Sequence, residues 1–402
     1  MPTDVTAGPH PDHVDAARVV SFDYLGDPAF LADPFAGFDA LYDGDGIVWS
    51  SHHGGFWVLT REPLIREAFQ HPELFSSNPV GIPGAPRARP LIPLELDPPD
   101  HAWYRSVLAP WFSPAAVDRR RELVETSAES LVAALAPLGT GDVMTAVAQP
   151  LPTGVFAQLL GLPADESQRF LDWNWTMVHD YEHPEAREAA GKAVAAYLEE
   201  LVAARAADPR DDLISALHGC EVQGRTMTQD ELINVCYLLF MAGLDTVTAA
   251  LGFCFHWLAR NPETRDAVVA DPERVMGLVE ELLRVHAFVQ STRTVTQDTE
   301  LHGVAMKAGD RVLLATAVAS RDPNELDHAA DVDLDRVGAR SYAFGAGAHR
   351  CLGSHLARVE IAAAIRAFHR HIPVYELADP DDVTYWGGGV LGIQRLRLRW
   401  PA

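Results

Sequence analysis

The chain has 402 residues, with 32 Lys and Arg against 56 Asp and Glu, and so a formal charge of −24. Apolar residues make up 48% and charged residues 22%, a composition that is typical of a globular protein and excludes a largely disordered chain. The negative charge argues against nucleic acid as the main partner, because phosphates would be repelled over most of the surface.

The cysteines and the N-terminus bear on the compartment. The sequence holds four cysteines, Cys220, Cys236, Cys254 and Cys351. They form no C-x-x-C pair and are too few for a disulfide framework, so a reducing cytoplasm is expected. The N-terminus has no basic region followed by an apolar core, and therefore no signal-peptide pattern.

One apolar stretch, 236–259, is long enough to span a bilayer. Its only formally charged residue, Asp245, lies near the middle, where a charge is costly in lipid. We therefore expect a helix buried through the middle of a large soluble domain, and no membrane contact.

The elements predicted in chain order are mostly helices. Residues 1–20 are expected to be a flexible N-terminus, and 21–402 a single domain. Residues 21–75 mix short helical patterns with strands such as 55–60, and 76–99, rich in Pro, Gly and Arg, predict a long irregular loop. From residue 100 the apolar spacing predicts helices. They are expected at 100–111, 115–136, 142–161, 165–182, 185–207, 211–219, 228–260, 262–270 and 272–286.

The pattern changes after residue 286. Residues 289–318 alternate as strands do, with a turn at 307–310. A glycine-rich loop at 345–353 leads into a helix at 354–370, and 373–400 predict short strands. The expected fold class is mainly α with a minor β region.

The strongest chemical signal is the segment Phe344–Gly353, with the sequence FGAGAHRCLG. Cys351 comes just before a predicted helix, whose N–H groups and positive end favour a thiolate. The glycines of the segment would let a large flat ligand approach the backbone. The segment therefore predicts one thiolate presented to a metal in a bulky cofactor.

Three other interpretations compete for this segment. Cys351 could be an ordinary buried cysteine. His349, Cys351 and His355 could bind zinc, although no fourth donor has a standard spacing. The glycines could cradle phosphate, but no Lys-Ser/Thr follows as a P-loop requires.

The segment resembles the cysteine loop of the cytochromes P450, with the pattern F-G-x-G-x-H-x-C-x-G, at every fixed position. The resemblance extends over residues 45–400 and is closest to the bacterial camphor-hydroxylating type. It implies haem b with Cys351 as the axial thiolate ligand of iron. It also implies the family's fold, a triangular α-rich prism with a long central helix over the haem.

The second motif is Glu281-Leu282-Leu283-Arg284. Residues three apart share a helix face, so Glu281 and Arg284 can pair. In isolation such a pair is most often a solvated surface feature. The resemblance implies instead the family's buried structural ion pair.

The third motif, Ala242-Gly243-Leu244-Asp245-Thr246, lies in the middle of the long apolar helix. A Thr can bond back to a carbonyl one turn earlier and Gly243 weakens the same ladder, so a local bulge is expected. Asp245 could alternatively be structural. The motif resembles the family's A-G-x-D/E-T, which implies that Thr246 assists oxygen activation and that Asp245 feeds protons from solvent.

The fourth motif is Asp97-Pro98-Pro99-Asp100-His101-Ala102-Trp103-Tyr104-Arg105. His101 and Arg105 share a helix face, and two cations on one face indicate an external anion unless both are solvated at the surface. The motif resembles the family's D-P-P-x-H-x-x-x-R, which implies that His101 and Arg105 bind a haem propionate. Arg293 and His349 resemble the family's other propionate partners.

The family resemblance also places a substrate pocket. Its expected lining residues are Arg89, Leu91, Leu238, Met241, Ala242, Val289 and Val390. They are mostly apolar, which favours a small hydrophobic substrate, terpenoid or aromatic. The camphor-hydroxylating enzyme has an aromatic hydroxyl in the corresponding loop, but 87–92 contains no Tyr, so camphor itself is not expected. Arg87 or Arg89 could bind an anionic or carbonyl-bearing substrate, or be solvated loop charges.

The expected function is a bacterial monooxygenase that uses O2. The sequence shows no flavin-binding or iron–sulfur pattern, so electrons would come from a ferredoxin with its NAD(P)H-dependent reductase. Arg105, Arg350 and Arg358, with 119–121, would form the docking patch. A monomer is expected. The alternatives are a haem-thiolate peroxygenase or decarboxylase, a haem sensor or carrier, and a zinc hydrolase.

Overall fold

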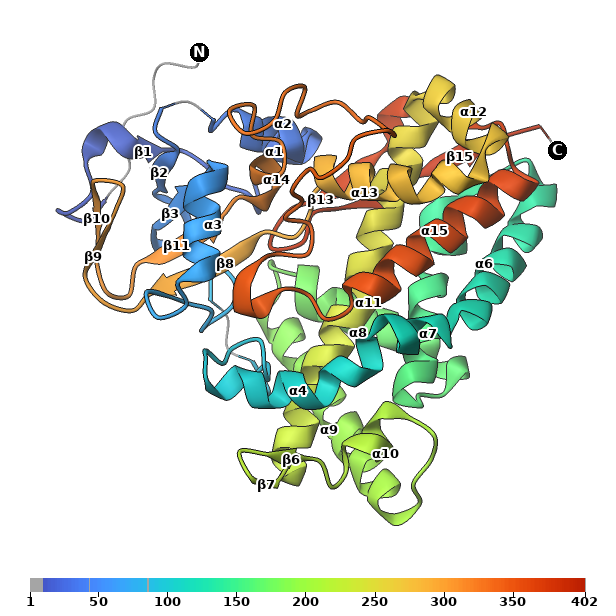
Figure 1. The fold of residues 1–402 in the computed structure, drawn as a ribbon, viewed down its shortest axis with the longest axis horizontal. Helices are drawn as coiled ribbons and strands as arrows, with labels where there is room; N and C mark the ends of the chain where they lie inside the picture. The colour runs from blue at the N-terminus through green and yellow to red at the C-terminus, as the bar shows by residue number, and fades with distance from the viewer. Residues whose placement is uncertain (1–9, 43, 85–86, 402) are drawn as a thin grey trace.

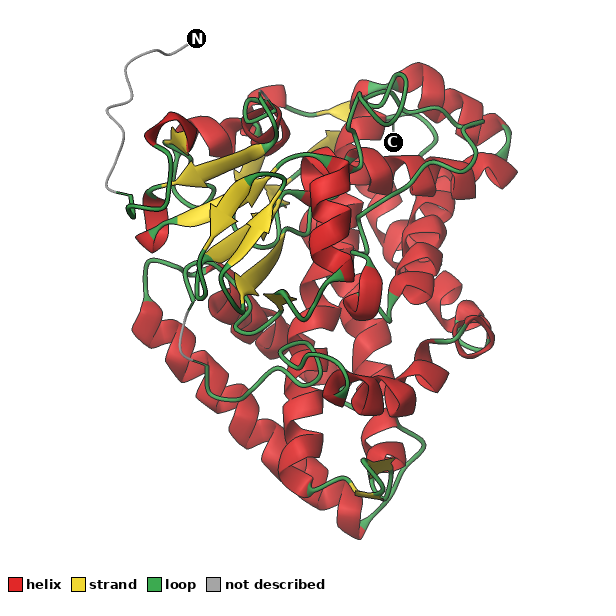
Figure 2. Ribbon diagram, turned by 60° about the vertical axis from the view of Figure 1, so that its left-hand side comes forward, coloured by secondary structure: helices red, strands yellow, loops and turns green. Residues whose placement is uncertain are grey.

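The computed structural model describes residues 10–42, 44–84 and 87–401. It is 53% helical, and its helices form a broad, roughly triangular body with the main sheet at one corner (Figure 1; Figure 2). The α-helices are α1 Pro28–Ala32, α2 Pro34–Asp39, α3 Glu62–Gln70, α4 Asp100–Phe112, α5 Pro114–Asp118, α6 Arg121–Leu135, α7 Pro150–Leu160, α8 Ser167–His179, α9 Pro184–Ala207, α10 Leu213–Leu217, α11 Gln229–Arg260, α12 Pro262–Ala270, α13 Val275–Val285, α14 Thr316–Ala319 and α15 Ser354–His371.

The strands form one larger sheet and several small ones. They are β1 Val19–Val20, β2 Ile47–Ser50, β3 Phe56–Leu59, β4 Phe75–Ser76, β5 Thr140–Asp142, β6 Glu221–Val222, β7 Arg225–Thr226, β8 Ser291–Val295, β9 Thr299–Leu301, β10 Val304–Met306, β11 Arg311–Leu314, β12 Glu376–Leu377, β13 Thr384–Trp386, β14 Gly392–Arg395 and β15 Arg397–Arg399. The six-stranded sheet has the order β1-β2-β3-β11-β8-β4. The mainly α fold with a minor β part is confirmed.

Strand β11 links the N-terminal and C-terminal parts of the larger sheet. It pairs in parallel with β3, with Val312 opposite Trp57, and antiparallel with β8, with Val312 opposite Arg293. All four residues of β3 are buried, which explains why that strand is a continuous apolar run. The pairing of β8 with β11 fixes the position of Arg293.

Helix α11 crosses the middle of the molecule (Figure 1). It begins with a capping box, in which Thr228 and Glu231 satisfy each other's backbone N–H groups. Among the described residues it is the one helix that is long and apolar enough to cross a bilayer, and 72% of its most apolar window is buried inside the protein. That burial identifies it as a core helix, as expected.

Two predicted helices are interrupted. The helix expected at 115–136 breaks into α5 and α6, where Arg120 turns back to donate to the Ala116 carbonyl at 3.0 Å. The helix expected at 142–161 is replaced by β5, a π-helical turn Met144–Ala148 and α7. Pro150 has no N–H to donate and thus cannot continue an α-helical ladder across this point, while Gln149 N–H bonds Met144 at 2.9 Å.

The N-terminal segment also differs from expectation. Residues 1–9 lie outside the described part, but 10–20 are folded against the sheet. Val14 is buried, and Val19 of β1 pairs with Trp49 of β2. The apolar residues Val14, Val19 and Val20 cover the sheet edge, which explains why this stretch is ordered although its composition is polar.

Candidate functional site

The cysteine loop is held against α3 and α4. Cys351 N–H donates to the Phe344 carbonyl at 2.9 Å, which closes the loop before α15 begins. Gly347 has a φ of +66°, and a Cβ there would lie 2.2 Å from the Phe69 carbonyl oxygen. Gly347 is therefore required by close packing on α3. The expectation that this glycine makes room for a ligand is wrong.

Cys351 lies inside the protein but borders an open cavity. It lines a cavity, which we call the thiol cavity, and keeps accessible surface there. Burial nevertheless raises the pKa of the thiol, and this outweighs the Gly353 N–H and the nearby arginines, which lower it. The Gly353 N–H and the arginines act in the direction that the sequence predicts, toward the thiolate. A coordinated metal ion would supply the missing stabilisation of the anion.

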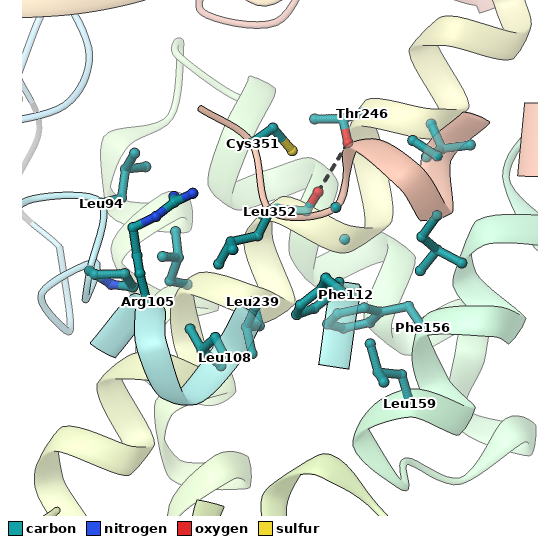
Figure 3. Close-up of a pocket in the computed structure, with 18 of the residues that line it drawn as sticks. Leu94, Arg105, Leu108, Phe112, Phe156, Leu159, Leu239, Thr246, Cys351 and Leu352 are labelled. Atoms are coloured by element: carbon teal, nitrogen blue, oxygen red, sulfur yellow. Dashed lines mark hydrogen bonds between the residues drawn. The ribbon is translucent and has the colours of Figure 1, made fainter. Parts of the chain in front are cut away.

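The thiol cavity separates Cys351 from the middle of α11. Its volume open to the centre of a water molecule is about 200 Å³, and Ala242, Gly243 and Thr246 line its α11 side. Figure 3 shows Cys351 and Thr246 at this cavity, with the rings of Phe112 and Phe156 farther along its wall. Most of the wall is apolar, so a bulky apolar group would be enclosed between the sulfur and the helix.

The middle of α11 is regular. Thr246 Oγ1 donates to the Ala242 carbonyl at 3.1 Å, as expected, but α11 continues without a break from Gln229 to Arg260. The expected bulge is therefore absent from this described helix. A Cβ on Gly243 would lie 2.3 Å from the Phe156 ring, so this glycine allows α7 to pack closely.

Asp245 is tied to a histidine on another helix. His179 Nε2, on α8, lies 3.0 Å from Asp245 Oδ2, and the two side chains are 2% and 8% exposed. The His179 ring packs against Trp175 and Trp386. Asp245 therefore has almost no direct contact with bulk solvent, in contrast to the expected route for protons. His179 was missed because a lone histidine, 66 residues before its partner, carries no spacing signal.

The four predicted propionate-binding residues come together beside the cysteine loop. The rings of His101 and His349 lie 4.8 Å apart. Burial and the charges of Arg293, His101 and Arg105 together lower the pKa of His349 to about 4. The charges have this effect because these groups lie close to the His349 ring. Asp97 is the neighbouring carboxylate that opposes the effect. Sequence motifs far apart in the chain thus form one cluster of basic side chains, the basic cluster.

Two members of the basic cluster are incompletely paired. His101 Nε2 donates to the Ala348 carbonyl at 3.2 Å, while its Nδ1 is buried without a partner among the described residues. Arg293 is 6% exposed and donates to the Thr292 carbonyl at 2.7 Å, and burial lowers its pKa to about 10. Arg105 donates to the Arg350 carbonyl at 2.7 Å and lines the thiol cavity.

Glu281 and Arg284 form a buried ion pair on α13. Arg284 Nε and Nη2 donate to the two Glu281 oxygens at 2.7 and 2.8 Å. The same guanidinium donates to the carbonyls of Ser320, Ala329 and Asp331. Although burial raises the pKa of Glu281, these contacts and Arg336 keep it below the ordinary value. The pair joins α13 to the segment before the cysteine loop, in agreement with a structural role.

A second cavity lies along α11 on the side toward the 76–99 loop. Its volume open to the centre of a water molecule is about 240 Å³, and it shares Ala242 and Thr246 with the thiol cavity. Six of the seven predicted pocket residues line it: Leu91, Leu238, Met241, Ala242, Val289 and Val390. The walls are mainly apolar, which fits an apolar ligand.

Arg89 does not belong to this pocket. Its guanidinium is turned away and pairs with Glu199 on α9 and Asp230 on α11. Arg87 lines the second cavity instead, but it donates to Glu95 at 2.7 Å and to the Val80 carbonyl at 2.6 Å. Placing Arg89 in the pocket was wrong because two exposed carboxylates attract it outward.

The zinc interpretation of His349, Cys351 and His355 depends on how the possible metal ligands are arranged. No group of three or more His, Cys, Asp or Glu side chains in the described ranges is placed to hold a metal ion, and His355 is exposed, so the zinc site is not supported.

Glu360, on α15, also lines the thiol cavity, and burial raises its pKa to about 8. Sequence analysis missed Glu360 because a single Glu in a helix usually faces solvent.

These residues fit haem b, the group that the sequence resemblance implies. Cys351 offers a sulfur with open space in front of it, and the facing residues of α11 are small or apolar. The unpartnered Nδ1 of His101 and the incompletely paired Arg293 are what two anionic carboxylates would complete.

Comparison with known proteins gives one consistent result. The family model for cytochrome P450 matches residues 165–384. A probable cytochrome P450 127A1 of Sinorhizobium fredii is 35% identical and covers 98% of each chain. The mycinamicin IV hydroxylase/epoxidase of Micromonospora griseorubida is 31% identical and covers 83% of this chain and 86% of its own.

A solved structure agrees over the whole fold. The crystal structure of CYP101J2 matches with a TM-score of 0.90 and 32% identity, covering 98% of this chain and 100% of that one. Relatives that include a hydroxylase/epoxidase share this architecture and most of this chain's length. The chain therefore belongs to the cytochrome P450 family of haem-thiolate monooxygenases, whose cofactor is haem b.

Proposed function

We propose that this protein is a bacterial cytochrome P450 that uses O2 and two electrons from a ferredoxin to hydroxylate a small, mainly hydrophobic substrate of terpenoid or aromatic type. The observation that carries the proposal is the pair of cavities that meet at Ala242 and Thr246. One contains the Cys351 sulfur and the other is an apolar pocket. The protein would act as a single-domain monomer in the cytoplasm.

Cys351 would supply the thiolate that holds the haem iron, and His101, Arg105, Arg293 and His349 would hold the haem propionates. When bound, the haem supplies an iron centre at which one atom of O2 enters a C–H bond and the other leaves as water. The basic cluster would balance the two propionate charges inside the protein.

Asp245 and Thr246 would be the catalytic residues of the chain itself. Thr246 Oγ1 gives its own proton to the Ala242 carbonyl, so its lone pairs remain free to accept a hydrogen bond in the cavity. Asp245 Oδ2 would hold a proton for delivery, with His179 Nε2 as its partner in exchange. This acid–hydroxyl pair supports O2-dependent chemistry over the peroxygenase alternative, because a peroxide user has less need of delivered protons.

Electrons would come from a ferredoxin and its NAD(P)H-dependent reductase. The described structure refines the docking patch expected from the arginines. Arg358 is engaged by Glu280 and lies over the Phe344 ring, and Arg105 is partly buried. Arg350 and Arg119 are exposed and make no ion pair to a described residue. They would contribute most to the attraction of an acidic ferredoxin.

The first test of the proposal is the spectrum of the purified haem-loaded protein after reduction with dithionite and addition of carbon monoxide. A strongly red-shifted Soret band is expected, and Cys351→Ser should abolish it. Retention of the band in Cys351→Ser would show that another residue is the ligand. The absence of any haem binding by the wild-type protein would refute the proposal.

The second test concerns Thr246. With a bound substrate, Thr246→Ala should keep the haem spectrum but divert NAD(P)H oxidation from product to peroxide. Thr248→Ala is a matched control, since Thr248 makes the same type of back-bond, to Leu244 at 3.1 Å, but is buried against Ala148 away from both cavities. Full coupling in Thr246→Ala would remove Thr246 from the mechanism.

The third test concerns the redox partner. With a bacterial 2Fe–2S ferredoxin, Arg119→Glu should slow reduction by the ferredoxin and leave reduction by dithionite unchanged. Arg397→Glu, which alters an exposed arginine on β15, is the control. Equal slowing with both reductants would contradict the docking assignment.

A further inference from the structure

The second cavity follows one stripe of α11. Tyr237, Met241 and Asp245 are spaced by four residues and share a face, and all three line the cavity. Tyr237 and Thr246 are nine residues apart, which corresponds to about 13 Å along the helix axis. The cavity is therefore long in the direction of α11, with Thr246 near one end and Tyr237 near the other.

The polar side chains of this cavity are almost all occupied by the protein itself. Arg87, Asp245 and Thr246 make the contacts already described. The others bond as follows: Arg187 donates to the Met177 carbonyl at 3.1 Å, Glu188 pairs with Lys192 at 2.5 Å, Gln290 donates to the Ala287 carbonyl at 3.0 Å, Thr292 accepts from Gly81 N–H at 2.9 Å, and the Tyr181 hydroxyl meets the Gly389 N–H. Each of these side chains therefore already makes at least one contact within the protein.

The Tyr237 hydroxyl is the exception among the described residues that line this cavity. Tyr237 is 2% exposed, and no described residue hydrogen-bonds its hydroxyl. A Cβ on Gly191 of α9 would lie 2.8 Å from that oxygen, so the absence of a side chain there is what allows the hydroxyl to fit. A ligand that displaced water from this hydroxyl without offering an acceptor would leave it unpartnered, which is unfavourable.

The chemistry of this hydroxyl at neutral pH is that of a donor. Burial raises the pKa of Tyr237 to about 12, so the phenol keeps its proton. A protonated phenol donates to an oxygen acceptor, and in a mainly apolar cavity an uncharged acceptor such as a carbonyl or ether avoids the cost of burying a charge. A hydrocarbon would leave the hydroxyl unpartnered.

We propose that Tyr237 donates a hydrogen bond to an oxygen of the substrate, and so selects elongated apolar molecules that carry a carbonyl or ether oxygen roughly 10 Å from the carbon oxidised beside Thr246. This inference rests on the proposed function, since it assigns the second cavity to substrate. It narrows the small, mainly hydrophobic substrate to an extended molecule and gives that molecule an oriented position. Tyr237 is thus a specificity-determining residue.

The test is a titration of the ferric protein with 2-decanone and with 2-methyl-1-decene, in which a CH2 group replaces the carbonyl oxygen. Binding is followed by the shift of the Soret band from low spin to high spin. The wild-type protein should bind the ketone about 3- to 10-fold more tightly, the ratio expected for one uncharged hydrogen bond. Tyr237→Phe should lose this preference and bind the alkene at least as well as before.

Two controls separate the possible failures. Tyr181→Phe removes a cavity hydroxyl that already faces the Gly389 N–H, and it should retain the preference for the ketone. The red-shifted carbon monoxide band must be present in every variant, and its absence would count against the proposed function instead. With that band present, an unchanged preference in Tyr237→Phe, or no preference in the wild-type protein, would overturn the role of Tyr237.

Discussion

Two buried arginines, Arg284 on α13 and Arg293 on β8, differ in how completely they are paired. Arg284 is 1% exposed and directs its donors to Glu281 and to three carbonyls. Arg293 is 6% exposed, yet among the described residues only the Thr292 carbonyl accepts from it. Both carry a charge inside the protein, where an unpaired charge is costly.

The difference separates structural charges from binding charges. The contacts of Arg284 are complete within the chain, so its role ends with the fold. Arg293 lies beside other basic groups. Asp97 is the carboxylate whose charge raises the pKa of Arg293, against the lowering by burial. An incompletely paired buried cation among other basic groups indicates an anionic ligand, and haem b has two propionates that meet this need.

The largest effect is expected from breaking the complete pair. Arg284→Ala removes the guanidinium that binds both oxygens of the buried Glu281 carboxylate and leaves it only Arg336 and the Asp333 N–H, so the free energy of unfolding should fall by about 3–5 kcal/mol. Urea denaturation of the haem-loaded protein would measure it. If that variant does not fold, Arg284→Lys should show a smaller loss, because lysine cannot bind both carboxylate oxygens. A loss below that of an ordinary surface change in either variant would contradict the structural role.

Replacing the incompletely paired Arg293 should affect haem retention more than the stability of the fold. Arg293→Gln removes one charge-assisted hydrogen bond to the cofactor and should weaken haem retention about 10- to 100-fold, measured as haem transfer to apomyoglobin. The fold should be little affected, because Arg293 makes few contacts within the protein. Arg311→Gln on the neighbouring strand is the matched control, since its guanidinium binds the Pro79 and Gly81 carbonyls. Equal loss of haem from both variants would refute the distinction.

Glu360 is a buried acid and can be compared with the two buried arginines. Burial raises its pKa from 4.5 to about 8, so its contribution to stability is complete below pH 4.5 and is lost as pH rises toward 8. Glu360→Gln should therefore become more stable relative to the wild-type protein as pH increases from 6 to 8. Melting temperatures across that range would show it, and a constant difference would mean that a bound group pairs with Glu360.

The smallest effect is expected at Arg89. Its partners Glu199 and Asp230 are exposed, so Arg89→Gln should change the free energy of unfolding by less than about 1 kcal/mol. The titration with 2-decanone should be unchanged, because the side chain does not line the second cavity. A clear loss of ketone affinity would bring Arg89 back into the pocket.

Long patterns in the sequence predicted most of the site. The ten residues around Cys351 and the motif around Thr246 each specify both a backbone shape and a chemistry, so the structure brings them together as expected. The residues proposed to bind the propionates followed from the same family pattern. Helix α11 was predicted within one residue at its start, since its capping box and apolar run act locally.

Contacts between distant elements could not be predicted in this way. The pairing of His179 with Asp245 and the outward turn of Arg89 depend on which side chains meet across α8, α9 and α11. The π-helical turn at Met144–Ala148 was hidden because apolar spacing continues through it. The only local signals were Pro150 and Pro152, which do not specify the kind of interruption.

The unbroken course of α11 has a consequence for regioselectivity. Because Tyr237 and Thr246 belong to one rigid helix, movement of the surrounding loops leaves the spacing between them unchanged. That spacing would set the number of carbons between the oxygen of the substrate and the oxidised position. Moving the hydroxyl one turn, by Tyr237→Phe with Met241→Tyr, would shorten the distance from the hydroxyl to Thr246 by about 6 Å. Oxidation would then shift toward the oxygen-bearing end of the substrate.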